Sequence, residues 1–114
     1  MNGVTIMHKD QPVMKITWDK NTIQSQWLGK HHIKIPPDMY PGKITIKAFV
    51  DWCETRQPPR TRIGIDELLR TVYKMKTYLP IQMCRKSHGI THEDDLWMLF
   101  DNEGVIKYET LSVR

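Results

Sequence analysis

The sequence predicts an α+β fold, in which an N-terminal β-hairpin or small antiparallel sheet packs with about three short helices and a C-terminal strand. Two β-prone runs at 4–7 and 13–18, separated by a turn, predict the hairpin. Apolar residues at helical spacing over 46–87 predict the helices, and the apolar run 96–100 predicts a buried strand. The chain has 114 residues, so we expect a single domain spanning 1–114.

The N-terminal hairpin follows from its turn residues and from side-chain alternation. Lys9-Asp10-Gln11-Pro12 is a natural turn, because Asp tolerates tight turns and Pro fixes φ. In the second run Met14, Ile16 and Trp18 share one face, which we expect to be buried. A turn at Asp19-Lys20-Asn21 then predicts a third strand over 23–28.

The first helix is predicted from about Ile46 to Arg56. Thr45 can cap its N-terminus, and Gln57-Pro58-Pro59 ends it sharply. Phe49, Trp52 and Cys53 form an apolar stripe on this helix. The stripe indicates a face packed in the core.

Two further helices are expected before the last strand. The second is predicted from Arg62 to about Lys74, and its apolar residues at helical spacing are Ile65, Leu68, Leu69 and Val72. Pro80 opens the third, which runs from Ile81 to about Ser87 and is closed by Gly89.

The C-terminal part is predicted to contain strands. Thr91-His92-Glu93-Asp94 is typical of a capping sequence that places acidic residues over a helix N-terminus. Leu96 to Phe100 is an apolar run that predicts a buried strand, and Asp101-Asn102-Glu103-Gly104 predicts a turn. One more strand is predicted over Val105 to Tyr108.

The composition indicates an ordinary globular protein of the cytoplasm. Hydrophobic residues make up 39% and charged residues 26% of the chain. No run approaches the roughly 18 apolar residues of a membrane span, and residues 1–10 lack a signal-peptide pattern. Cys53 and Cys84 are expected to be free thiols. The net charge of +4 only weakly favours an acidic partner or nucleic acid, because the basic residues are scattered.

No catalytic or cofactor site is predicted. His8-Lys9-Asp10 is superficially similar to a kinase catalytic triplet, but Lys15 occupies the place of the metal-binding Asn. The six glycines are isolated, so there is no glycine-rich phosphate loop. We therefore interpret the triplet as a charged turn and expect no enzymatic activity.

A metal site is not expected either. Cys84, His88 and His92 are four residues apart and could act with Cys53 as zinc ligands, but Gly89 interrupts the helix that would align them. The Cys-x₂-Cys pair typical of zinc knuckles is also missing. A buried Cys and two solvated His side chains fit the pattern better.

Three arginines around the Pro-Pro connector form the predicted partner-binding surface: Arg56, Arg60 and Arg62. We interpret them as an exposed patch that faces a protein partner. A helix-turn-helix that binds DNA is the alternative, with Lys74 and Lys76 as further basic residues. The proline-stiff connector and the acidic start of the second helix, Asp66-Glu67, are unusual for that motif.

Three blocks together resemble the N-terminal region of HipA-like serine/threonine kinases of the Gram-positive type. The first is His8-Lys9-Asp10-Gln11-Pro12-Val13 and the following strand. The second is the segment from Phe49 to Gly64, with Leu68-Leu69 after it, and the third runs from Gly89 to Met98. The three blocks have the order and rough spacing of the family's blocks, and the resemblance covers essentially the whole chain. Cys53 replaces the second of the family's paired tryptophans, and Glu93 or Asp94 replaces a serine of the third block.

The resemblance implies a role as a binding protein. In the family, the ATP-binding and catalytic segments follow this region. The resemblance therefore implies an N-terminal subdomain that packs on the kinase core, and it implies no enzymatic activity. A separate small protein of this kind, the HipS-type antitoxin subunit, restrains the kinase in tripartite bacterial toxin–antitoxin systems. The expected partner is thus a HipA-like kinase core, and the core or motif residues are Trp18, Phe49, Trp52, Leu68, Leu69 and Trp97. The alternatives are a small basic nucleic-acid-binding regulator or a phage or mobile-element decoy.

Overall fold

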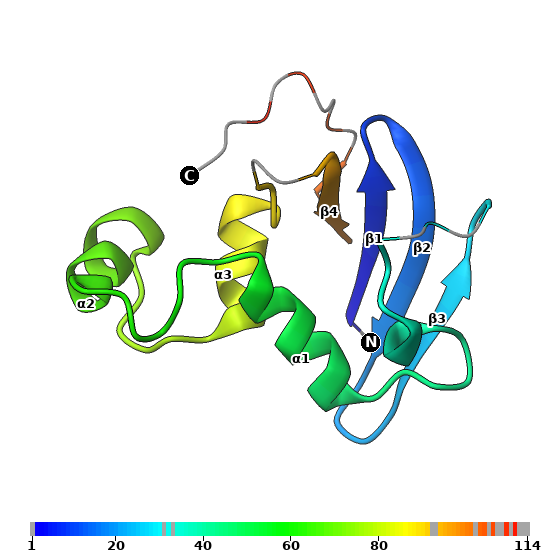
Figure 1. The fold of residues 1–114 in the computed structure, drawn as a ribbon, viewed down its shortest axis with the longest axis horizontal. Helices are drawn as coiled ribbons and strands as arrows, with labels where there is room; N and C mark the ends of the chain where they lie inside the picture. Colours follow the sequence, from blue (N-terminus) through cyan, green and yellow to red (C-terminus); the bar gives the residue numbers. More distant parts are fainter. Residues whose placement is uncertain are drawn as a thin grey trace.

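A four-stranded antiparallel sheet with the strand order β3-β2-β1-β4 forms one side of the molecule (Figure 1). The computed structural model describes residues 2–30, 32, 34–91, 94–101, 103–104, 106, 109 and 111. β1 (Asn2–His8) and β2 (Gln11–Trp18) form the predicted hairpin. β3 (Ile23–Trp27) extends the sheet beyond β2, and β4 (Leu96–Phe100) pairs with β1. The prediction of an α+β fold is confirmed.

The register of the sheet places apolar side chains on one face. Ile6 lies opposite Met14 of β2 and Met98 of β4, and all three side chains are buried. The expected burial of Met14 and Ile16 is confirmed. Trp18 is only partly buried, and its ring packs on Phe49 with the ring centroids 5.2 Å apart.

α1 (Ile46–Thr55) and α3 (Pro80–Ser87) pack against each other, and residues of both belong to the core beside the sheet. α1 begins as predicted at Thr45, whose Oγ1 accepts a hydrogen bond from the N–H of Ala48 at 3.0 Å. Phe49 and Trp52 are buried on the inner face of α1. A short 3₁₀-helix, η1 (Pro37–Met39), adds the buried side chain of Met39 to the same core.

The second helix is shorter than predicted. α2 (Ile65–Leu68) continues into a π-helical turn, η2 (Leu69–Tyr73). Gly64 has φ of 81° and Lys74 has φ of 56°, and this left-handed backbone at each end restricts the helix to the residues between them. In this turn Leu69 and Tyr73 are buried and Val72 is exposed, and Leu68 just before it is half-buried.

Among the described residues, the buried apolar side chains form three clusters. The largest lies between the sheet and helices α1 and α3. The second lies between η2 and α3 and contains Leu69, Tyr73, Tyr78 and Met83. The third contains Met7, Ile90 and Trp97, with Ile106 and Leu111 packed against them. α3 lies between α2 and the sheet in Figure 1, so it contributes to two of the clusters.

The entry into β4 differs from the predicted helix cap. The carboxylate of Asp94 accepts a hydrogen bond from the N–H of Leu96 at 3.1 Å, and the chain enters the strand there. Asp94 therefore caps no helix; His92 and Glu93 lie outside the described residues. The strand predicted over 105–108 also falls largely outside them. Within the described part of the chain, no helix is long and apolar enough to cross a membrane.

Candidate functional site

Arg56 lies at the C-terminal end of α1, and its side chain is turned into the molecule. The residue is 8% exposed. Its Nη1 and Nη2 donate hydrogen bonds to the two carboxylate oxygens of Asp94 at 3.1 and 2.7 Å, and Nη2 also donates to the carbonyl of Leu96 at 2.8 Å. Its Nε donates to the carbonyl of Gly89 at 2.5 Å, and the guanidinium lies over the ring of Trp52. The prediction that Arg56 is part of an exposed patch is wrong, because Asp94 and two carbonyls bind it internally.

The surroundings of Asp94 favour its ionised form. Burial acts to raise the pKa of its carboxyl group. The hydrogen bonds and positive charge of Arg56, together with the N–H of Leu96, outweigh burial and hold the pKa below its usual value. Asp94 is therefore ionised at neutral pH and forms a bidentate, charge-assisted pair with Arg56.

The connector between α1 and α2 is anchored from inside by Gln57. Its Oε1 accepts a hydrogen bond from the hydroxyl of Tyr73 at 2.9 Å, and its Nε2 donates to Oγ of Ser87 at 3.0 Å. The next residue is held as well, because the hydroxyl of Tyr78 donates to the carbonyl of Pro58 at 2.6 Å. With the fixed φ of two prolines, these bonds leave the connector little conformational freedom.

The outer part of the connector is exposed from Pro59 onward, and its largest exposed side chains are those of Arg60, Arg62 and Ile63. The guanidinium of Arg60 lies 4.5 Å from the centroid of the Tyr78 ring, and its Nε is 3.4 Å from Oε1 of Glu54. The side chain of Arg60 nevertheless stays 59% exposed. Ile63 is 98% exposed. The expected exposure is thus found for Arg60 and Arg62.

An open groove of about 550 Å³ lies beside these residues. It is lined by Asp51, Glu54, Thr55, Gln57, Pro59, Arg60 and Thr61. The outer side of α1 supplies carboxylates, and the connector supplies a guanidinium. We call the groove, with Arg60, Arg62 and Ile63, the connector surface. It offers hydrogen-bond donors and acceptors together with the apolar side chains of Pro59 and Ile63, as protein-binding surfaces do.

The two cysteines face each other across the α1–α3 contact. Both are buried, and Sγ of Cys84 lies 3.6 Å from the carbonyl oxygen of Cys53. Hydrogen bonding to Cys84, and then burial, raises the pKa of the Cys53 thiol. Cys53 is therefore a protonated core residue at neutral pH.

Of the considered zinc ligands, Cys53 and Cys84 lie together, but His88 does not complete a metal site with them. Nε2 of His88 lies 2.7 Å from Oε2 of Glu103. No group of three His, Cys, Asp or Glu side chains among the described residues is arranged to hold a metal ion. His92 lies outside them.

The geometry around the connector also bears on the DNA-binding alternative. Arg56 is buried and so cannot act with the exposed Arg60 and Arg62 on DNA. The helix α2 spans only the four residues Ile65–Leu68. Asp66 and Glu67 lie in its first turn. A helix that reads a major groove contacts bases with its N-terminal residues. These acidic side chains would meet phosphates at that position, so the arrangement gives this alternative little support.

Sequence reasoning missed Gln57, Asp94 and Ile63. No local pattern predicts the pairing of Arg56 with Asp94, since 38 positions separate them. The local sequence indicates that a helix ends at Gln57 but does not predict its hydrogen bonds with Tyr73 and Ser87. The exposure of Ile63 could be predicted from the sequence, because Ile63 is a single apolar residue between Arg62 and Gly64 and precedes the helical pattern.

Comparison of the chain with models of protein families, with curated proteins and with solved structures gives no match. The resemblance to HipA-like kinases therefore stays a prediction from the three sequence blocks.

Proposed function

We propose that the protein is a non-catalytic interaction module that binds and regulates a HipA-like kinase, as an antitoxin or accessory subunit. The class of partner comes from the resemblance of the three sequence blocks. The observation that carries the binding role is the anchored connector. Gln57 and Pro58 are bonded to the interior, while Arg60, Arg62 and Ile63 extend into solvent.

Pre-ordering supports a role in binding. A segment that is already fixed loses little conformational entropy when a partner covers it, and more of the contact energy then appears as affinity. The guanidinium of Arg60 is also held over the ring of Tyr78. Arg is enriched among the residues that dominate protein interfaces, and a positioned guanidinium pairs with carboxylates in a planar, directional way.

The exposed isoleucine supports the same surface. Covering a fully exposed Ile side chain contributes about 1.5–3 kcal/mol. Ile63 lies next to Arg62, so one partner surface could cover the apolar side chain and pair with the guanidinium. We therefore expect the kinase to present an apolar pocket bordered by Asp or Glu.

The proposal is tested with an Arg60→Glu variant and a purified HipA-like kinase. The wild-type chain should bind the kinase in surface plasmon resonance. Arg60→Glu should weaken the complex by about 1–3 kcal/mol, mainly through faster dissociation. Lys20→Glu is the matched control, because it makes the same charge change at an exposed turn between β2 and β3. It should leave kinase binding unchanged.

Two results would count against this function. Equal kinase affinity of Arg60→Glu and the wild-type chain would remove the connector surface from the interface. A sequence-specific DNA complex with a Kd below about 10⁻⁸ M, lost in Arg60→Glu, would favour the nucleic-acid-binding regulator instead. Urea unfolding of each variant separates a loss of contact from a loss of folding.

A further inference from the structure

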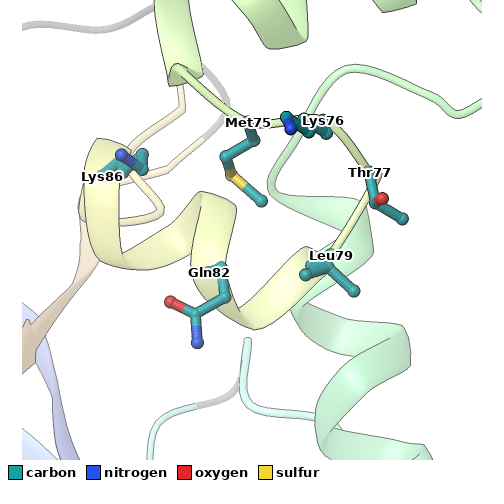
Figure 2. Close-up of a pocket in the computed structure, with 6 residues that line it drawn as sticks. All are labelled: Met75, Lys76, Thr77, Leu79, Gln82 and Lys86. Atoms are coloured by element: carbon teal, nitrogen blue, oxygen red, sulfur yellow. The ribbon is translucent and has the colours of Figure 1, made fainter.

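A second groove lies between the loop 74–79 and α3. Its volume is about 320 Å³, and it is lined by Met75, Lys76, Thr77, Leu79, Gln82 and Lys86. Figure 2 shows that the first four come from the loop and the last two from α3. None of them belongs to the connector surface.

The groove has an exposed apolar part. Leu79 is 48% exposed, although both of its chain neighbours, Tyr78 and Pro80, are buried. Met75 packs on the second apolar cluster and remains half-buried. Figure 2 shows the side chain of Met75 extending into the space between the loop and α3. The flexible thioether of Met adapts to differently shaped apolar partners.

The charge of the groove is positive. Lys76 and Lys86 form no salt bridge with any described residue, and none of the six lining residues is acidic. The N-terminal end of α3, which follows Leu79, has no side-chain cap and no acidic residue in its first turn. Its positive partial charge lies beside Leu79, whereas Lys86 is in the last turn of α3. A carboxylate bound here would find cations that no group of the described chain neutralises.

We propose that this groove binds an acidic segment of the partner kinase, with an apolar side chain against Met75 and Leu79 and an Asp or Glu carboxylate near Lys76 and Lys86. The inference rests on the proposed function for the identity of the partner. The lining favours a peptide over nucleic acid, because it contains no aromatic or arginine side chain on which bases could stack. Because the groove is basic, it selects acidic segments of the partner over neutral or basic ones.

The chemistry of the groove is tested by selecting short random peptides on the immobilised full-length protein. Enriched peptides should combine an apolar residue with nearby Asp or Glu. In fluorescence anisotropy, Lys76→Glu and Lys86→Glu should each weaken binding of the best labelled peptide by about tenfold, and Leu79→Ser by a similar factor. Lys20→Glu should leave its affinity unchanged.

Several outcomes would overturn this inference. They are a selection that enriches no acidic peptide, peptide binding that is insensitive to the lysine variants, and a labelled single-stranded DNA that binds the groove more tightly than the peptide. Full-length kinase gives an independent measurement. If kinase binding is lost in Arg60→Glu but unchanged in Lys76→Glu and Lys86→Glu, the groove inference fails and the proposed function stands. If no HipA-like kinase binds but acidic peptides do, the proposed function fails and the chemistry of the groove stands.

Discussion

Arg56 joins three segments of the chain through one guanidinium. It extends from the end of α1, donates to Gly89 after α3, and pairs with Asp94 before β4. Its side chain is 5% exposed and that of Asp94 13%. When one partner of such a pair is removed, the other charge remains buried without compensation, which costs more than the pair itself contributes. The geometry therefore indicates a structural role for Arg56.

Replacing Asp94 by Asn tests this role and its pH dependence. At pH 7 the free energy of unfolding should fall by about 2–4 kcal/mol, near the range for broken buried pairs. Because the folded pKa of Asp94 is lowered, the stabilisation is present above the unfolded value of about 3.9 and is lost as the pH falls through the folded value. The difference between the wild-type and Asp94→Asn chains in urea unfolding should therefore shrink below about pH 4.

Asp38→Asn is the control for this measurement. Asp38 is exposed in η1, and the change should alter the free energy of unfolding by no more than about 0.5 kcal/mol. A loss in Asp94→Asn that is the same at pH 7 and pH 3 would show that packing of the carboxyl group, and not its charge, is responsible.

At the scale of single elements, each helix boundary has a local cause, but only some of these causes can be recognised in the sequence. α1 begins at a threonine cap and ends before two prolines, and both signals lie in adjacent residues. The second helix begins after Gly64 and ends at Lys74, both in left-handed conformation. Gly is recognisable as such a residue, but a lysine adopts this backbone only rarely. Even so, the predicted end near Lys74 agrees with the structure, whereas the predicted start at Arg62 lies three residues before the observed one.

Thr45→Ala should weaken α1 without disturbing the core. The change removes the Oγ1 acceptor of the Ala48 N–H, and the free energy of unfolding should decrease by about 0.5–2 kcal/mol. Thr45→Ser keeps the acceptor and should retain most of the stability. Thermal or urea unfolding of the three chains distinguishes these cases. An equal loss in Ser and Ala variants would assign the effect to the methyl group of Thr45.

For the whole molecule, Gln57 links the second apolar cluster to the rest of the fold. Its side chain bonds to Tyr73 of η2 and to Ser87 of α3. α2 and η2 are too short to be stable alone, since isolated helices below about 12–15 residues are marginal in water. The helical conformation of α2 and η2 therefore depends on the packing of Leu69 and Tyr73 and on the hydrogen bonds of Gln57.

Tyr73→Phe should therefore loosen one part of the molecule selectively. It removes the hydroxyl donor to Gln57 and should cost about 0.5–1.5 kcal/mol. Hydrogen exchange measured by mass spectrometry should accelerate over residues 65–73 and stay unchanged in β1 and β2. Val72→Ala, on the exposed side of the same turn, is the control and should change neither region. Uniform acceleration over the whole chain would contradict the link.

The sequence by itself determined the elements whose causes are local. Turn residues and side-chain alternation predicted the β1–β2 hairpin, the stripe of Phe49, Trp52 and Cys53 predicted the inner face of α1, and the apolar run predicted β4. These patterns involve residues a few positions apart, and their period directly reflects backbone geometry.

Only the tertiary structure decided which of the three arginines faces solvent. Arg56 is buried because Asp94, Gly89 and Leu96 come together around it, and all three lie more than 30 positions away in the chain. The Met75–Leu79 groove likewise exists only where the loop folds back on α3. Burial and charge pairing depend on distance in space, and residues this far apart in the sequence are brought together only by the packed fold.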